Sequence, residues 1–434
     1  MNKILKIALF FLILSACSIS KNSKFWTSSK KIEQEPILKV NEIILKEKSI
    51  NLELNPSLKI KLFSKPVNKS FINNFDNNNG RINFDGLIEN SSRLKYSKIK
   101  NFYQYDPVIS FDKNNIIFFN KKGTILKFND NSKLVWKKNY YSKSEKKLNP
   151  VLLFANNKKI LVIVDNITKY YAINIKTGEL LWSKNNRAPF NSQVKIYKDK
   201  FFSVDLENVI RCFSLKDGSE IWNVKTDNTL IRSQKKLSMV VVGENVYFSN
   251  SIGDISAVDI NTGSLIWQIP TQSKLVYEEA FSLKNSDLVA DNNSLYFSNN
   301  KNNFFSIDID TGTINWQQKI NSTVRPTIID NYLFTASFEG YFFVIDKKTG
   351  SIIRITDIFK EFKAKKRKNI HPVGFIMGIN NIYLTTSNGR LLIIDTLTSE
   401  IKSILKIDNE KISRPFVMGN NLYIIKDSSI IKLN

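Results

Sequence analysis

The stretch Ser256-Ala-Val-Asp-Ile-Asn-Thr-Gly-Ser-Leu-Ile-Trp267 combines a strand, a tight turn and a second strand within one short segment. Its first strand ends at Asp259, whose side chain can accept hydrogen bonds from the backbone ahead and start a turn. Gly263 can adopt positive φ and close a short hairpin. Trp267 follows four residues later, and a side chain of that size requires a large buried surface. The stretch therefore predicts a β-hairpin that packs against a neighbouring unit.

Copies of this stretch recur along most of the chain, and positions equivalent to Trp267 lie 38 to 49 residues apart. That spacing is typical of a four-stranded propeller blade. A shorter turn distinguishes the copy at residues 125–136, and Ser399 replaces the glycine in the copy at 392–403. The remaining copies align without gaps at residues 171–182, 211–222, 305–316 and 343–354.

Proline positions support the same repeat. Six of the ten prolines lie just before an apolar segment. Because proline has no N–H, it fits the first residue of a strand and not its middle. These prolines therefore mark where the first strand of a blade begins. They are Pro107, Pro150, Pro189, Pro326, Pro372 and Pro415.

The repeat predicts an all-β fold, an eight-bladed β-propeller of four-stranded antiparallel blades. The C-terminal blade lacks one strand, and the alternating residues 56–63 are expected to supply it, so that an N-terminal strand closes the ring. The propeller would span residues 55–434, with a surface insertion at 64–103. One large aromatic per repeat suits the seams between blades. The predicted seam residues are Trp136, Trp182, Trp222, Trp267 and Trp316.

The N-terminus has the pattern of a lipoprotein signal. Lys3 and Lys6 precede a short apolar run that ends in Ser15-Ala16-Cys17. The run is too short for a permanent membrane span, so we expect residues 1–16 to be a signal peptide. Cys17 would be lipidated, and residues 17–54 would form a tether to the outer membrane. An ordinary secretory signal with an incidental cysteine remains the alternative.

The formal charge of +25 raises the question of a nucleic-acid or membrane-surface partner. Lysines are scattered over the whole chain and form no stripe, which favours a generally basic, solvated surface and no nucleic-acid partner. Attraction to anionic lipid headgroups stays open. Besides Cys17 the chain has one cysteine, Cys212, so an internal disulfide would have to involve the lipidated residue. Cys212 occupies a small core position of the repeat.

The pattern Ala-x-Asp-x-x-Thr-Gly-x-x-x-Trp, clearest from Ala257 to Trp267, resembles the pyrroloquinoline-quinone (PQQ) propeller superfamily. Within that superfamily, Cys17 after the signal and the ending from Ser413 to Leu433 resemble the BamB family of outer-membrane protein assembly factors. The resemblance implies a non-catalytic lipoprotein of the β-barrel assembly machinery, without a cofactor, that faces the periplasm. The implied partners are the POTRA domains of the barrel insertase BamA, other lipoproteins of the machinery and nascent outer-membrane proteins.

The resemblance also implies a docking surface. The family has a Leu-x-Leu-Arg loop, and the matching stretch here is Leu230, Ile231 and Arg232, which departs from the leucine spacing. A family Asp-x-Asp element corresponds to Asn285 and Asp287, with one acidic residue lost. An arginine beside apolar residues suits a binding hot spot. An ordinary solvated loop is the alternative.

Two other functions remain open from the sequence. A PQQ-type quinoprotein enzyme would share the repeat, but we recognise none of the carboxylate and amide ligands or paired cysteines that its chemistry needs. His371 is the single histidine, which excludes a multi-histidine metal site, and its position before Pro372 suits the start of a strand. A ligand-binding periplasmic propeller lipoprotein is the third possibility, because propeller faces bind many kinds of ligand.

Overall fold

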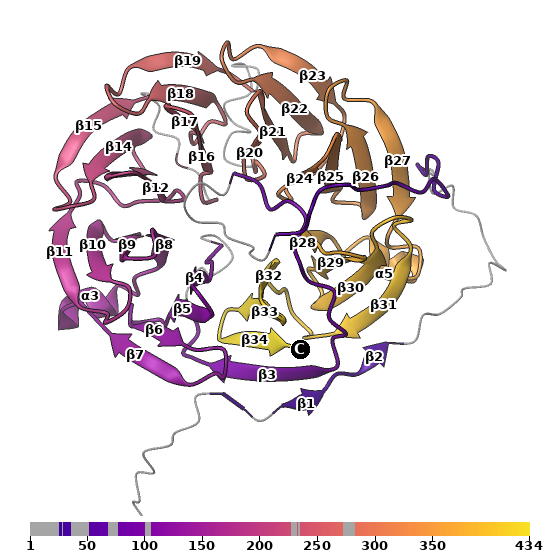
Figure 1. The fold of residues 1–434 in the computed structure, drawn as a ribbon, viewed down its shortest axis with the longest axis horizontal. Coiled ribbons are helices and arrows are strands. Elements are labelled where there is room, and N and C mark those ends of the chain that lie inside the picture. The colour runs from indigo at the N-terminus through magenta and orange to yellow at the C-terminus, as the bar shows by residue number, and fades with distance from the viewer. Residues whose placement is uncertain are drawn as a thin grey trace, which may run out of the picture.

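The computed structural model describes residues 26–27, 29–35, 52–67, 77–99, 106–226, 232, 235–271 and 283–434. Eight antiparallel sheets are arranged around a central axis, as Figure 1 shows. Each sheet is one blade, whose first strand lies at the axis and whose last strand lies on the outside. The prediction of an eight-bladed β-propeller is therefore confirmed.

Blades 1 to 4 follow one another along the chain. Blade 1 consists of β4 (Ser110–Asp112), β5 (Asn115–Phe119), β6 (Ile125–Phe128) and β7 (Leu134–Lys138). Blade 2 consists of β8 (Leu152–Asn156), β9 (Ile160–Asp165), β10 (Lys169–Asn174) and β11 (Leu180–Asn185). Blade 3 consists of β12 (Lys195–Tyr197), β13 (Lys200–Val204), β14 (Val209–Ser214) and β15 (Glu220–Lys225). Blade 4 consists of β16 (Met239–Val242), β17 (Asn245–Ser249), β18 (Ile255–Asp259) and β19 (Leu265–Ile269).

Blades 5 to 7 continue the pattern, and blade 8 combines the two ends of the propeller. Blade 5 consists of β20 (Val289–Ala290), β21 (Ser294–Asn299), β22 (Asn303–Asp308) and β23 (Ile314–Gln318). Blade 6 consists of β24 (Thr327–Ile329), β25 (Tyr332–Ala336), β26 (Tyr341–Asp346) and β27 (Ile352–Asp357). Blade 7 consists of β28 (Pro372–Met377), β29 (Asn381–Thr386), β30 (Arg390–Asp395) and β31 (Ile401–Lys406). Blade 8 consists of β32 (Pro415–Met418), β33 (Asn421–Lys426), β34 (Ser429–Leu433) and β3 (Asn90–Lys95).

The closing strand differs from the one expected. An N-terminal strand does complete blade 8, but it is β3, which pairs antiparallel with β34 from Ser91 opposite Leu433 to Lys95 opposite Ser429. The assignment of this role to residues 56–63 is wrong, because that segment forms no strand. It runs along the rim, where the backbone N–H of Ile60 donates to the carbonyl of Leu397. The closing strand thus lies inside the range 64–103 that was expected to be a surface insertion.

Other N-terminal residues pair with the outer edges of neighbouring blades. β1 (Lys30–Lys31) pairs with β3, and β2 (Gln34–Glu35) pairs with β31 of blade 7. Leu54 exchanges two backbone hydrogen bonds with Ile355 in β27 of blade 6. The described residues between 26 and 63 therefore follow the rim of three consecutive blades.

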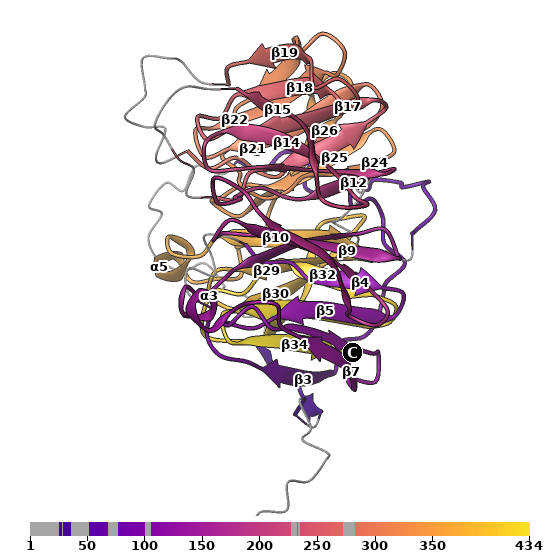
Figure 2. The same cartoon turned by 90° about the vertical axis from the view of Figure 1, so that its left-hand side faces the viewer.

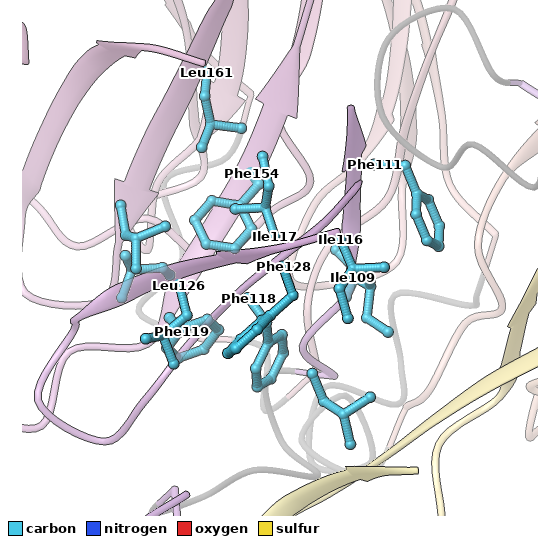
Figure 3. Close-up of a cluster of buried hydrophobic side chains, with 14 of the residues drawn as sticks. Ile109, Phe111, Ile116, Ile117, Phe118, Phe119, Leu126, Phe128, Phe154 and Leu161 are labelled. Carbon is cyan, nitrogen blue, oxygen red and sulfur yellow. The ribbon is translucent and has the colours of Figure 1, made fainter. Parts of the chain in front are cut away.

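Apolar side chains packed between blades form the core. Figure 3 shows part of the cluster between blades 1 and 2, where Phe119 meets Phe154 edge to face with ring centroids 5.9 Å apart. Alternate residues of a strand face opposite sides, so a middle strand is buried against both neighbouring blades. In β9, for example, all residues after Ile160 are buried. Outer strands such as β11 are mostly exposed.

The two faces of the disc carry different connections. The links from the outer strand of one blade to the inner strand of the next lie on one face, here called the top face. α3 (Lys143–Lys147) and α5 (Ala364–Arg367) lie on this face, and the N-terminal segment crosses the opposite one (Figure 2). Among the described residues, no helix is long and apolar enough to cross a membrane.

Candidate functional site

The five tryptophans of the repeat lie at the seams between blades. Each indole N–H donates to a backbone carbonyl in the third-to-fourth-strand turn of the next blade. The bond from Trp222 Nε1 to the carbonyl oxygen of Ile260, for example, is 2.9 Å long. Each ring therefore combines apolar burial with a satisfied N–H. The acceptors for Trp136, Trp182, Trp222, Trp267 and Trp316 are Ile175, Leu215, Ile260, Ile309 and Lys347.

The glycine of each turn lies directly against the ring. Gly263 has φ +75°, and a Cβ atom there would lie 2.8 Å from the Trp222 ring. Gly218 contacts Trp182 in the same way. The glycine of the Thr-Gly pair is thus required for two reasons, its positive φ and the close approach of the indole.

The seam between blades 6 and 7 has other residues. Arg354 occupies the tryptophan position and is fully buried, and Ser399 occupies the glycine position with φ +59°. The Arg354 guanidinium donates to the hydroxyl of Ser399 and to two backbone carbonyls, those of Leu58 and Leu397. Burial lowers the pKa of Arg354 to about 10. The guanidinium therefore stays charged at neutral pH.

On the top face, a serine fixes the start of several inner strands. Ser286 and Ser413 each accept a hydrogen bond from the backbone of the next strand, 2.9 Å from Ser298 N and 2.8 Å from Ile425 N. Each hydroxyl also donates to the carbonyl of the residue that follows it. The residue after the serine is thereby held at the axis end of its blade. In blade 5 that residue is Asp287.

In blade 8 the residue after the serine is Arg414. Its Nη1 lies 3.7 Å from Asp287 Oδ2, although the two belong to different blades. Further charged residues lie within electrostatic reach of these two. We call the whole group the axial cluster. It consists of the cations Lys235, Lys236, Arg325, Lys411 and Arg414 and the carboxylates Asp106 and Asp287.

Four members of the axial cluster are buried and three are partly exposed: Lys236, Asp287, Arg325 and Arg414 are buried, and Asp106, Lys235 and Lys411 are partly exposed. Burial opposes ionisation of Asp287, but the nearby cations, chiefly Lys236 and Arg414, outweigh it and lower the pKa of this carboxyl to about 2. Burial lowers the pKa of Lys235 and of Lys411. For both lysines, burial outweighs the attraction of the nearby carboxylates.

The predicted docking residues fall on the same face. Leu230 and Ile231 lie outside the described residues, as does Cys17. Arg232 is partly exposed and lies three residues before Lys235, whose ammonium donates to the carbonyl of Asn285. The loops that precede blades 4 and 5 therefore meet. Arg232 and Asn285 remain candidates for contact with a partner.

Asp287 has a different environment from a surface docking residue. Its side chain is 8% exposed and faces the axial cluster. The cations around it were not singled out from the sequence. The available signal was the pair Arg325-Pro326 and Arg414-Pro415, which places an arginine just before two inner strands.

The two remaining candidate residues, Cys212 and His371, are accounted for by packing. Cys212 is buried, and burial raises the pKa of its thiol to about 12. His371 stacks on Phe338 with ring centroids 4.5 Å apart, and burial lowers its pKa. Among the described residues, no three or more His, Cys, Asp or Glu side chains are grouped so that they could hold a metal ion.

Comparison with solved structures supports the fold. The crystal structure of BamB from Moraxella catarrhalis superposes with a TM-score of 0.61 at 16% identity, over 79% of this chain and 99% of that one. The computationally designed Ika8 protein superposes with a TM-score of 0.57 at 15% identity, over 75% of this chain and 94% of that one. At these identities the likeness shows the fold alone.

Comparison of sequences gives a distant enzyme and a family. Quinoprotein ethanol dehydrogenase from Pseudomonas putida is 24% identical over 135 residues, which span 26% of this chain and only 22% of the enzyme. The family model described as outer membrane protein assembly factor BamB matches residues 121–356, more than half of the chain. This protein therefore belongs to the BamB family of PQQ-repeat propellers.

Proposed function

We propose that this protein is a non-catalytic scaffold lipoprotein of the β-barrel assembly machinery. In this proposal it binds the periplasmic POTRA domains of BamA and assists the insertion of outer-membrane β-barrel proteins. Other lipoproteins of the machinery and nascent barrel proteins would be further partners. Membership of the BamB family is the observation that carries the proposal.

The top face of blades 3 to 5 is the proposed docking surface. Arg232 belongs to the connection between β15 and β16, and Asn285 belongs to the connection that precedes β20. The contact between Lys235 and Asn285 joins the two connections at their bases. Asp287 would support the surface from below through Arg414, since both side chains are buried. A partly exposed arginine on such a base is a suitable anchor for a partner.

Lipidation at Cys17 is the proposed membrane attachment. The residues from Ser15 to Cys17 carry the cleavage pattern, and the propeller would then lie at the periplasmic side of the outer membrane. Basic surface residues would add attraction to anionic headgroups. Metabolic labelling with a radioactive fatty acid tests this attachment, because a Cys17→Ala variant should lose the label.

Co-purification from detergent-solubilised outer membranes tests the docking role. The tagged full-length protein is compared with an Arg232→Glu variant and with Arg187→Glu as a matched control. Arg187 is an exposed arginine in the connection between blades 2 and 3, on the same face but outside the two connections that carry Arg232 and Asn285. We expect the native protein and the Arg187 variant to retain the insertase and the Arg232 variant to lose it.

The outcomes separate role from surface. If all three proteins retain the insertase, the scaffold role stands and the choice of Arg232 is wrong. If none retains it, the assembly role itself is wrong.

The quinoprotein enzyme is the second candidate, favoured by the 135-residue match to the ethanol dehydrogenase. Its test is dye-linked alcohol oxidation by the purified protein with PQQ added. Cofactor-dependent turnover would replace the scaffold proposal with the enzymatic one. A propeller that binds a carbohydrate or peptide ligand is the remaining alternative.

A further inference from the structure

The guanidinium of Arg414 is buried without enough partners. Arg414 is 6% exposed, and its Nε and Nη2 atoms have no hydrogen-bond partner among the described residues. Its Nη1 lies 3.7 Å from the Asp287 carboxylate, which is too long for a hydrogen bond. A buried guanidinium with unused N–H groups is costly, because it has lost its hydration and gained little in return.

Other cations of the axial cluster lie near the same carboxylate as Arg414. Lys235, Lys236 and Arg325 are all within electrostatic reach of Asp287. The ammonium of Lys236 lies 3.6 Å from Asp106 Oδ2 and donates to the Asp106 carbonyl oxygen at 3.0 Å, so Asp106 is already engaged. The side chain of Lys236 is 2% exposed. The positive charge of Lys236 is therefore held away from water.

The cluster is assembled from several blades at one level of the axis. Asp287, Arg325 and Arg414 precede the inner strands of blades 5, 6 and 8, and Lys236 precedes that of blade 4. The inner strands surround the axis in Figure 1. The axial cluster thus brings residues of blades 4, 5, 6 and 8 together at the top end of the axis.

The other end of the axis is covered by the chain itself. Asn77 bonds to Val241 at the end of β16, and Asn78 bonds to Ile328 in β24. Ile82 N donates to the carbonyl of Met377 at the end of β28. The indigo segment in Figure 1 follows this path over the inner strands. The axial cluster therefore lies at the end of the axis that this segment does not cover.

Packing beside Arg414 keeps space for its side chain. A Cβ atom on Gly374, in β28 of blade 7, would lie 2.4 Å from the Cβ of Arg414. Any larger residue at position 374 would displace the arginine. On the other side, the Arg414 guanidinium lies over the Phe416 ring, with Cζ 5.2 Å from the centroid. This contact orients the fork without using its N–H groups.

We propose that the axial cluster is a binding site for a small oxyanion, a phosphate or a carboxylate, with the unpartnered Nε and Nη2 of Arg414 as its main donors. The planar fork of a guanidinium binds two oxygens of such an anion at once. Lys236 adds positive charge from blade 4, opposite blade 8, and Arg325 adds it from blade 6. Asp287 competes with the anion for Arg414, so its carboxylate sets the affinity.

Calorimetric titration of the detergent-solubilised full-length protein tests this site. Sodium phosphate and sodium acetate are the probes, with sodium chloride keeping the ionic strength constant. We expect saturable binding of at least one probe, and its preference distinguishes a phosphate from a carboxylate ligand. Arg414→Gln should weaken binding about tenfold or more, because it removes a charged bidentate donor.

A second variant should act in the opposite direction. Asp287→Asn should strengthen binding about tenfold, since it removes the competing carboxylate. Matched controls change the same charges elsewhere: Arg187→Gln on the top face, and Asp291→Asn, whose carboxylate lies 3.0 Å from the ammonium of Lys347. Both controls should bind like the native protein.

Several results would overturn the site. These are no saturable binding of either probe, equal binding by the native protein and a folded Arg414→Gln variant, or an equal gain from Asp287→Asn and Asp291→Asn. If Arg414→Gln does not fold, the comparison of the two aspartate variants decides. The site is independent of the docking proposal, because co-purification with the insertase and anion binding are separate measurements.

Discussion

The seam between blades 3 and 4 and the seam between blades 6 and 7 solve one packing problem with different chemistry. At the first, the Trp222 ring covers Gly263 and its N–H bonds to the Ile260 carbonyl. At the second, Arg354 lies in the place of the ring and bonds to Ser399 and two carbonyls. The same backbone turn is used in both, with positive φ at Gly263 and at Ser399.

The difference shows what the repeat position requires. The side chain must be large, must fill the space under the turn, and must donate at least one hydrogen bond to the next blade. An indole satisfies this with one donor and apolar area, whereas a guanidinium needs several acceptors because it buries a charge. The acceptor from Leu58 is supplied by the N-terminal rim segment. Arg354 is therefore suited to a seam that this segment crosses.

The largest effect is expected at the tryptophan seam. Trp222→Ala should lower the free energy of unfolding by about 3 to 5 kcal/mol, because it leaves a cavity and an unbonded carbonyl. Ile221→Ala is the matched control, since Ile221 is adjacent but 45% exposed, and it should cost about 0.5 kcal/mol or less. Denaturant unfolding measures both. Similar losses in the two variants would contradict the role of the indole.

The seam between blades 1 and 2 contains a buried carboxyl group with a raised pKa. Burial raises the pKa of Asp165, in blade 2, to about 7, and Tyr141 donates to its carboxylate at 2.6 Å. Because the folded state binds this proton more tightly than the unfolded chain, the contribution is fully present below about pH 4. It is lost as pH rises to about 7, by at most about 4 kcal/mol.

An Asp165→Asn variant tests this pH dependence. An asparagine can keep the two backbone bonds from Ile167 and Lys169, as Asn250 does in the equivalent turn of blade 4. We expect the variant to lose less stability than the native protein between pH 4 and 7. Parallel curves of unfolding free energy against pH would show that Asp165 is ionised throughout.

Steric contact at the turn gives the next effect. Gly263→Ala should cost about 2 kcal/mol, because alanine is strained at φ +75° and its Cβ would meet the Trp222 ring. Gly243→Ala provides the control for backbone strain alone, since φ is +58° there and nothing lies within 4 Å of the added Cβ. Thermal unfolding should separate the two variants. An equal loss of stability in the two variants would show that position 263 requires glycine for its backbone angle alone.

The smallest effect concerns conversion of one seam into the other. Arg354→Trp should destabilise the protein, because Ser399 carries a Cβ where a tryptophan seam has none. Adding Ser399→Gly should recover about 1 to 2 kcal/mol, a coupling that a double-mutant cycle measures. Additive losses would mean that the two positions do not form one packing unit.

The blade repeat could be predicted from the sequence because its signals are local. Asp259, Gly263 and Trp267 lie within nine residues, and each has a direct physical reason. The closing strand could not be predicted in this way. β3 is largely polar, with Leu94 as its one buried side chain, so it lacks the alternation by which residues 56–63 were favoured.

The axial cluster was missed for another reason. Its members come from separate blades, and lysine and arginine are abundant everywhere in the chain. Nothing in the local sequence of Lys236 or Asp287 indicates that they approach each other. Position along the repeat was the usable clue, since Arg325 and Arg414 both precede a proline that starts an inner strand.

Closure of blade 8 has a consequence for the order of synthesis. More than 330 residues separate β3 from its partner β34. While the chain is being made, β3 lacks β34, and the ring cannot close before residues 429–433 have been synthesised. Seven blades can therefore form while blade 8 still has an unpaired edge, which favours pairing with other extended chains. Folding of this protein should consequently benefit from chaperones that shield such edges until the last strand is made.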